Sequence, residues 1–269
     1  MDSFITALQF DFMRNALLAG LLVSLAAGIV GVYVVLNRVA TLSGGIAHAA
    51  YGGVGMAYFF GFDPLLGGMV FSLVAALGMN IVQRRTRQRA DTLIGVMWAV
   101  GMAVGIIFVD RAPGYKVDLM SFLFGSILAV SPFEIAIIAI LDVVILLTVV
   151  SLYRNLLAIS YDQTFATVRG VPVEAISLIL TALIALTVVM MMRVVGLILV
   201  IALLTLPAAI ANLFARDMRQ MMALASGLGV IFTLTGLWLS YTYNLTSGAT
   251  IILVAAVTYL LGLLYKRRR

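Results

Sequence analysis

Residues 15–36 read NALLAGLLVSLAAGIVGVYVVL and contain no charged side chain. A helix needs about 20 mostly apolar residues to cross the ~30 Å hydrocarbon core of a bilayer, so this stretch is long enough to span it. Asn37 and Arg38 follow at once and mark its end. The alternation of a long apolar run with a short polar break recurs along the whole chain and predicts a membrane helix bundle.

Nine apolar runs of this kind are separated by charged or turn-forming residues. They are residues 15–36, 42–61, 64–82, 92–109, 134–153, 175–192, 194–214, 221–241 and 247–265. The short connection at 62–63 predicts a tight hairpin, and Arg193 alone divides the sixth run from the seventh. We therefore expect an all-α, polytopic bundle of about nine transmembrane helices, with residues 1–269 forming a single transmembrane domain.

The composition excludes several classes of protein. Of the 269 residues, 64% are hydrophobic and 10% are charged, against about 45–50% and 25% in a soluble domain. The chain has no cysteine, which excludes disulfides and thiolate metal sites and leaves nitrogen, oxygen and thioether ligands. The net charge of +6 sits in short clusters between apolar runs. Because no basic stripe is interleaved with aromatic residues, nucleic acid is not a predicted partner.

The basic residues predict the orientation of the chain. Lysine and arginine near span ends are enriched on the cytoplasmic side. Placing the cluster at 83–89 inside leaves four of the 17 basic residues outside: Arg14, Arg111, Lys116 and Arg193. We therefore expect an external N-terminus, a cytoplasmic C-terminus and a cytoplasmic loop at 154–174. Residues 1–9 carry only one charge, an acid, so no cleavable signal peptide is predicted.

One external segment is apolar but too short to span. Residues 119–130 lie within the predicted external stretch 110–133 and are better interpreted as an interfacial or re-entrant helix packed against protein.

The densest glycine cluster of the chain surrounds its one histidine. At helical spacing Gly44, His48 and Gly52 share one face, and Gly45 and Gly53 lie on the next. Small residues of this kind allow helices to pack closely in a membrane. His48 is then either an imidazole facing a path, where it can ligate a cation or relay a proton, or a histidine hydrogen-bonded between tightly packed helices.

Asp142 is the second unusual residue, because it lies about midway along the run 134–153. A charge at the bilayer centre costs at least about 2.5–3.5 kcal/mol on insertion scales. Asp142 is therefore interpreted in one of two ways: as a carboxylate near a path through the membrane, or as a neutral acid bonded to a neighbouring helix or placed nearer the interface.

The predicted cytoplasmic loop contains a short helical pattern. Asp162, Ala166 and Gly170 recur at i, i+4 and i+8, and Gly170 precedes Val171 and Pro172 as a helix-terminating glycine. Such a helix suits the docking of a soluble partner, although a linker helix without a partner has the same pattern.

Several of these segments together resemble the zinc/manganese/iron ABC importer permeases. The stretch Leu36-Asn37-Arg38-Val39-Ala40-Thr41-Leu42-Ser43-Gly44-Gly45-Ile46-Ala47-His48-Ala49, followed by Gly52-Gly53-Val54-Gly55, is similar to the second-helix signature of that family. Further matches, in the family's order, are Ile94-Gly95, Ala103-Val104-Gly105, Phe122-Leu123-Phe124-Gly125, the positions Asp162, Ala166 and Gly170, residues 195–200 and residues 206–211.

The resemblance implies a permease subunit of an ATP-driven importer for zinc, manganese or iron in the prokaryotic cytoplasmic (inner) membrane. It implies a homodimer, two copies of an ABC ATP-binding subunit, an external metal-binding protein, and a coupling helix around Asp162, Ala166 and Gly170. It also implies that this chain is not an enzyme and binds no cofactor of its own, with ATP hydrolysed in the partner subunit. The sequence contains no P-loop, in agreement with this division.

His48 matches the family's second-helix histidine, which is implicated in metal passage. Many members carry an aspartate four residues before it, where this chain has Gly44. The metal would therefore meet fewer permanent ligands here, or another acid such as Asp142 would substitute.

Three alternatives stay open at the level of sequence. A membrane scaffold or sensor would use the loop helix without a substrate path. A permease for a metal chelate such as a siderophore would need a wider path and typically one more span. A self-sufficient secondary transporter would show an inverted internal repeat, and none is evident in the sequence.

Overall fold

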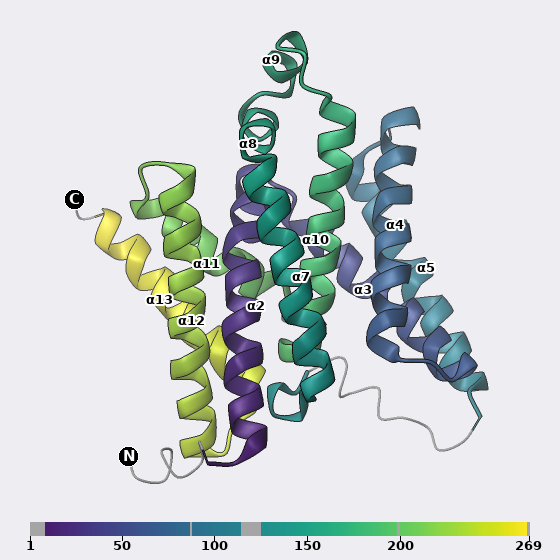
Figure 1. Ribbon diagram of the computed structural model, residues 1–269, viewed down its shortest axis with the longest axis vertical. Coiled ribbons are helices and arrows are strands. Elements are labelled where there is room, and N and C mark those ends of the chain that lie inside the picture. Colours follow the sequence, from purple (N-terminus) through teal and green to yellow (C-terminus); the bar gives the residue numbers. More distant parts are fainter. Residues whose placement is uncertain (1–8, 87, 114–124, 198–199, 268–269) are drawn as a thin grey trace. The chain divides into compact units, whose positions relative to one another are not determined.

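The computed structural model describes residues 9–86, 88–113, 125–197 and 200–267. These residues form eleven α-helices and one turn of 3-10 helix, with no strand among them (Figure 1). The helices are α2 (Asp11–Leu36), α3 (Ala40–Phe60), α4 (Pro64–Thr86), α5 (Ala90–Arg111), α7 (Pro132–Ser151), α8 (Tyr153–Tyr161), α9 (Gln163–Val168), α10 (Val173–Val195), α11 (Val200–Phe214), α12 (Met218–Tyr243) and α13 (Ser247–Arg267). The prediction of an all-α membrane protein is confirmed.

Each of the nine predicted runs coincides with a helix, and seven of these helices are long and apolar enough to cross a membrane. The seven are α2, α4, α5, α7, α10, α12 and α13. The other two are α3, which has 21 residues but many small and polar ones, and α11, which has only 15 described residues. Nine crossings and an external N-terminus stay predictions.

The breaks between helices follow from local chemistry. Helix α3 ends at Gly61, whose φ of +74° is left-handed, and Asp63 then accepts a hydrogen bond from the Leu66 amide (3.0 Å) at the start of α4. Pro64 is the first residue of α4, where a missing N–H costs nothing. The predicted tight hairpin at 62–63 therefore forms.

One predicted boundary is wrong. Arg193 was expected to separate two spans, but α10 continues through Arg193 to Val195 and ends before Gly196, which has a φ of +84°. The arginine is tolerated inside the helix because it forms an ion pair with Glu134.

The predicted interfacial helix at 119–130 is only partly covered by the structure. Residues 119–124 lie outside the described residues. The described remainder holds a single 3-10 turn, Ile127–Ala129, in which Ile127 is buried.

The chain divides into two compact units. One comprises residues 1–35, 120–146 and 190–269, and the other comprises residues 36–119 and 147–189. In the first, α11 packs against α12 and α13, and the Ser24 hydroxyl of α2 lies 3.1 Å from the Thr233 hydroxyl of α12. In the second, α3 packs most extensively against α5 and α4. The second unit contains His48 and the loop helices α8 and α9.

Candidate functional site

His48 lies in the middle of α3 and is partly buried. Its Nδ1 lies 2.9 Å from the Gly44 carbonyl oxygen. Because a carbonyl can only accept a hydrogen bond, Nδ1 must carry the proton and donate it. In the neutral imidazole Nε2 is then left with a free lone pair, which is the arrangement that a metal-ligating histidine requires.

One face of the imidazole is covered by an aromatic ring of the neighbouring helix. The centroids of the His48 and Trp98 rings are 3.7 Å apart, with planes inclined at 35°. Trp98 belongs to α5 and keeps 43% of its surface exposed. The hydrogen bond and the adjacent indole together restrict the direction in which Nε2 points.

The glycines of α3 lie where neighbouring helices come closest. A Cβ on Gly45 would be 2.7 Å from the Ile94 side chain, and one on Gly52 would be 2.8 Å from the Phe71 ring. A Cβ on Gly53 would overlap the carbonyl oxygen of Gly67. These glycines therefore allow α4 and α5 to approach α3 directly, whatever else the helix does.

Gly44 is buried and contributes only its carbonyl to the histidine. This position therefore supplies no side-chain ligand. Within the described residues no three histidine, cysteine, aspartate or glutamate side chains lie together. The described chain thus offers no closed cage that would retain a divalent metal ion.

Asp142 lies near the middle of α7 and is only 6% exposed. Neither of its carboxylate oxygens has a hydrogen-bond partner in the described part of the chain. Burying a carboxylate without hydrogen-bond partners costs free energy. Most buried structural acids avoid this cost by forming hydrogen bonds, and Asp142 does not do so within the described residues.

The predicted cytoplasmic loop is mostly helical. Asp162 caps α9, accepting a hydrogen bond from the Phe165 amide (3.0 Å), and Ala166 is fully buried. Gly170 has a φ of +77°, and the amides of Gly170 and Val171 donate to the carbonyls of Thr167 and Ala166 (both 3.0 Å). This is the Schellman pattern of a helix end. The three predicted positions thus cap, anchor and terminate one short helix.

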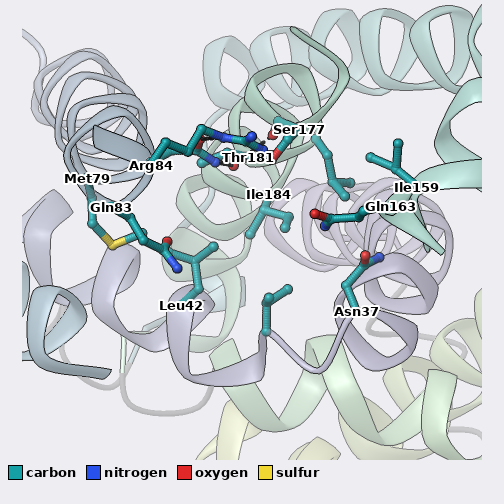
Figure 2. Close-up of a pocket in the computed structure, with 13 residues that line it drawn as sticks. Asn37, Leu42, Met79, Gln83, Arg84, Ile159, Gln163, Ser177, Thr181 and Ile184 are labelled. Carbon is teal, nitrogen blue, oxygen red and sulfur yellow. Dashed lines mark hydrogen bonds between the residues drawn. The ribbon is translucent and has the colours of Figure 1, made fainter. Parts of the chain in front are cut away.

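A polar cavity of about 380 Å³ lies in the same unit as α9. Figure 2 shows Asn37 and Gln163 on one side of it and Met79, Gln83 and Arg84 on the other. The full lining is Asn37, Val39, Leu42, Met79, Asn80, Gln83, Arg84, Ile159, Gln163, Ser177, Leu180, Thr181 and Ile184. The cavity is therefore bordered by the end of α4, by α10 and by the first residue of α9.

A hydrogen-bond network crosses one wall of this cavity. Asn80 Nδ2 donates to Thr181 Oγ1 (2.8 Å) and to Ser177 Oγ (3.3 Å). Arg84 Nε donates to Asn80 Oδ1 (2.9 Å). Asn80 therefore connects α4 to α10 and fixes the guanidinium of Arg84.

A second polar cluster lies in the other unit, at the start of α7. The Ser131 amide donates to Glu134 Oε2 (2.7 Å) and the Glu134 amide donates to Ser131 Oγ (3.3 Å), a reciprocal capping box. The other oxygen of Glu134 accepts from Arg193 Nε. Glu134 therefore ties the beginning of α7 to the end of α10.

Sequence reasoning missed Trp98, the Asn80 network and the Glu134–Arg193 pair. The spacing of Ser131 and Glu134 is a capping-box signature that the sequence displays. Asn80 and Arg84 stand at i and i+4, so a shared helix face was also readable. The pairing with Thr181 and Arg193 depends on tertiary structure and leaves no local signal.

A family model described as the ABC 3 transport family matches residues 9–266. The chain is 56% identical over 267 residues to an uncharacterized membrane protein, slr2045, of Synechocystis sp., covering 99% of this chain and 95% of that one. It is 32% identical to the manganese transport system membrane protein MntC of Halalkalibacterium halodurans, covering 97% and 90%.

The fold also matches a solved structure. PsaBC from Streptococcus pneumoniae, in complex with Fab, superimposes with a TM-score of 0.88 at 34% sequence identity. The match covers 97% of this chain and 94% of that chain, so the likeness extends over essentially the whole fold.

Proposed function

Since the chain belongs to the ABC 3 transport family, we propose that it is the membrane permease subunit of an ATP-driven importer for a divalent transition-metal ion. Zinc, manganese and iron are the candidate substrates. The name of the MntC relative favours manganese, and the imidazole ligand suits zinc or iron as well. The name of the relative that is 56% identical mentions no substrate. The chain is a multi-pass protein, and its residues 1–269 act as one transmembrane permease domain.

The observation that carries the proposal is the orientation of His48. Its Nδ1–H is held by the Gly44 carbonyl, so Nε2 is available to a passing ion. A path must bind an ion well enough to admit it and weakly enough to release it. One imidazole, without the carboxylate that Gly44 replaces, meets this demand. Asp142 is a further candidate ligand for the ion.

The test of this role is metal uptake by proteoliposomes that contain the complete transporter. In His48→Ala we expect uptake of manganese or zinc, and metal-stimulated ATP hydrolysis, to fall at least about tenfold, because a ligand is lost. Trp98→Phe is the matched control, since it keeps an aromatic ring beside the imidazole. Wild-type uptake in His48→Ala would contradict the proposal and favour the scaffold or sensor alternative.

We further propose that α9 is the coupling helix that docks to the ATP-binding subunit. Three hydrophobic side chains at α9 or just before it are exposed, and they lie outside the predicted spans, where no lipid would cover them: Tyr161 (71%), Phe165 (54%) and Val168 (83%). Arg169 lies over the Phe165 ring, with its guanidinium carbon 5.1 Å from the ring centroid. Exposed apolar groups on a well-capped polar loop are typical of a protein interface.

A hollow next to α9 adds to this surface. It has a volume of about 580 Å³ and is lined by Thr167, Val171, Pro172, Val173, Glu174, Ala175 and Leu178. ATP-driven closure of two docked subunits would move the α9 helices of a permease homodimer and so alternate access to His48. An external metal-binding protein would deliver the ion on the opposite side.

Co-purification tests the docking surface. Val168→Glu places a charge at the most exposed of the three positions, so we expect the ATP-binding subunit to be lost from the purified complex. Gln88→Glu, in the connection between α4 and α5, makes the same change of charge on an exposed residue and should leave the complex intact. Equal recovery of the ATP-binding subunit with both variants would rule out α9 as the docking helix.

A further inference from the structure

We propose that the cavity beside Arg84 binds a phosphate-bearing anion, supplied by the headgroup of an anionic phospholipid in the leaflet on the α9 side. This site differs from the proposed metal path and does not depend on the identity of the transported ion.

The charge of the lining selects an anion. Arg84 is the one charged residue among the lining residues, and no carboxylate faces the cavity from the described residues. The other polar groups are the side chains of Asn37, Asn80, Gln83, Gln163, Ser177 and Thr181. A divalent cation would meet a guanidinium and no counter-charge here, whereas an anion would meet a guanidinium and neutral donors.

Arg84 is exposed, and a hydrogen bond positions its guanidinium. Its Nε is held by Asn80, which is itself held by Thr181 and Ser177 of α10. No hydrogen bond within the described chain engages the two terminal nitrogens of Arg84. These nitrogens form a planar donor fork, whose geometry matches the oxygens of a phosphate.

Two further side chains are available as donors. Gln83 and Gln163 line the cavity, and their amide groups make no hydrogen bond to any other described residue. Gln83 lies one residue before Arg84, and Gln163 lies across the cavity (Figure 2). An anion held by Arg84 can therefore be contacted by neutral amides from α4 and α9.

The location favours a lipid over a free ion. Arg84 belongs to the last turn of α4, and the basic residues Arg85 and Arg89 follow it, as in segments that attract anionic headgroups. Met79 lines the polar cavity and also an apolar groove of about 300 Å³ between α4 and α5. The groove is lined by Phe71, Ala75, Met79, Val82, Leu93, Val96, Met97, Val100 and Gly101. An acyl chain in the groove and a phosphate in the cavity would meet at Met79.

Native mass spectrometry of the purified full-length chain in detergent micelles tests the site. Phosphatidylglycerol is the probe and phosphatidylcholine the zwitterionic comparison. We expect Arg84→Gln to retain phosphatidylglycerol at least about tenfold less well than the wild type, because a charge-assisted pair is lost. Arg85→Gln removes the same charge from a residue that does not line the cavity and should bind as the wild type does.

Thr181→Val is the second variant, because it removes the hydroxyl that positions Asn80 without changing the charge. It should weaken retention of phosphatidylglycerol while the protein stays monodisperse in gel filtration. Equal losses in Arg84→Gln and Arg85→Gln would overturn the proposal, since the attraction would then be a general effect of the basic cluster.

A separate measurement distinguishes the source of the phosphate. Inorganic phosphate is added to delipidated protein, and its thermal stability is followed. Stabilisation that requires Arg84, without selective retention of phosphatidylglycerol, would support the anion site and overturn the assignment to lipid. If phosphate does not stabilise the protein but phosphatidylglycerol is retained through Arg84, both the anion site and its assignment to a lipid headgroup are supported.

Discussion

The burial of Asp142 carries a clear cost in the free energy of folding. The residue is only 6% exposed, and both of its carboxylate oxygens lack partners among the described residues. We expect the apolar substitution Asp142→Val to raise the free energy of unfolding by about 1–3 kcal/mol, because an unsatisfied polar group is removed. Thermal unfolding in detergent micelles measures this change. A marked loss of stability would mean that the carboxylate makes favourable interactions in the assembled protein.

A stabilised but inactive variant would identify Asp142 as a functional residue. Asp142→Asn preserves the shape of the side chain and removes its ability to ionise. Metal uptake by this variant therefore separates a role in transport from a role in packing.

Glu134 differs from Asp142, because both of its carboxylate oxygens accept hydrogen bonds. Glu134→Ala removes one half of the capping box of α7 and a partner of Arg193, and we expect it to cost about 2–5 kcal/mol. Glu134→Gln keeps a capping acceptor and should cost clearly less. Chemical unfolding of both variants, with Arg193→Gln as the second arm of a double-mutant cycle, measures the pair. Additive effects of Glu134→Gln and Arg193→Gln would show that the ion pair contributes nothing.

These two acids show what a sequence can and cannot say about a site. Asp142 was identified because a charge inside an apolar run is conspicuous whatever surrounds it. His48 was identified in the same way, but the Gly44 carbonyl and the Trp98 ring that orient it become visible only in the structure. The sequence predicts a helix boundary at Arg193 because its partner Glu134 lies 59 residues away in the chain and leaves no local signal.

At the scale of elements, α3 is the helix most dependent on glycine. In Gly53→Ala the new methyl group would overlap the backbone of Gly67, which cannot rotate away. We expect a loss of at least about 1–3 kcal/mol in the free energy of unfolding, as for other overpacked sites. Melting temperature and yield of monodisperse protein report this change.

Gly78 provides the matched control for that substitution. It lies inside α4, and a Cβ there would meet nothing within 4 Å. Gly78→Ala should stabilise the protein by up to about 1 kcal/mol, because alanine is the better helix former. If both glycine variants behaved alike, close packing would not be the reason for the glycine at position 53.

Most helix positions followed from the sequence, since long apolar runs flanked by charges leave few choices in a membrane. Helix α9 was also predictable, because Asp162 and Gly170 are residue types with strong capping preferences. The continuation of the preceding chain as α8 was not predicted. Its apolar run, residues 156–159, is only four residues long and is flanked by Asn155 and Ser160, and Leu156 and Ile159 are buried in the folded protein.

At the scale of the whole molecule, the number of crossings between Phe62 and Thr246 depends on α11. Its 15 residues would extend about 22 Å at 1.5 Å per residue, which is less than the ~30 Å hydrocarbon core. If the segment 194–214 crosses, as predicted, six spans separate Phe62 from Thr246, and both residues face outward. If it does not cross, five spans separate them and they face opposite sides.

The absence of native cysteines makes this question directly testable, because a single introduced cysteine is then the only reactive thiol. Phe62 and Thr246 are both exposed and lie between helices. We expect Phe62→Cys and Thr246→Cys to react with a membrane-impermeant maleimide in intact cells, whereas Gln88→Cys should react only after permeabilisation. Labelling of Phe62→Cys alone would show that the chain crosses once fewer between these positions. Labelling of Gln88→Cys alone would invert the orientation and place the proposed coupling helix α9 outside the cell, where no ATP-binding subunit could reach it.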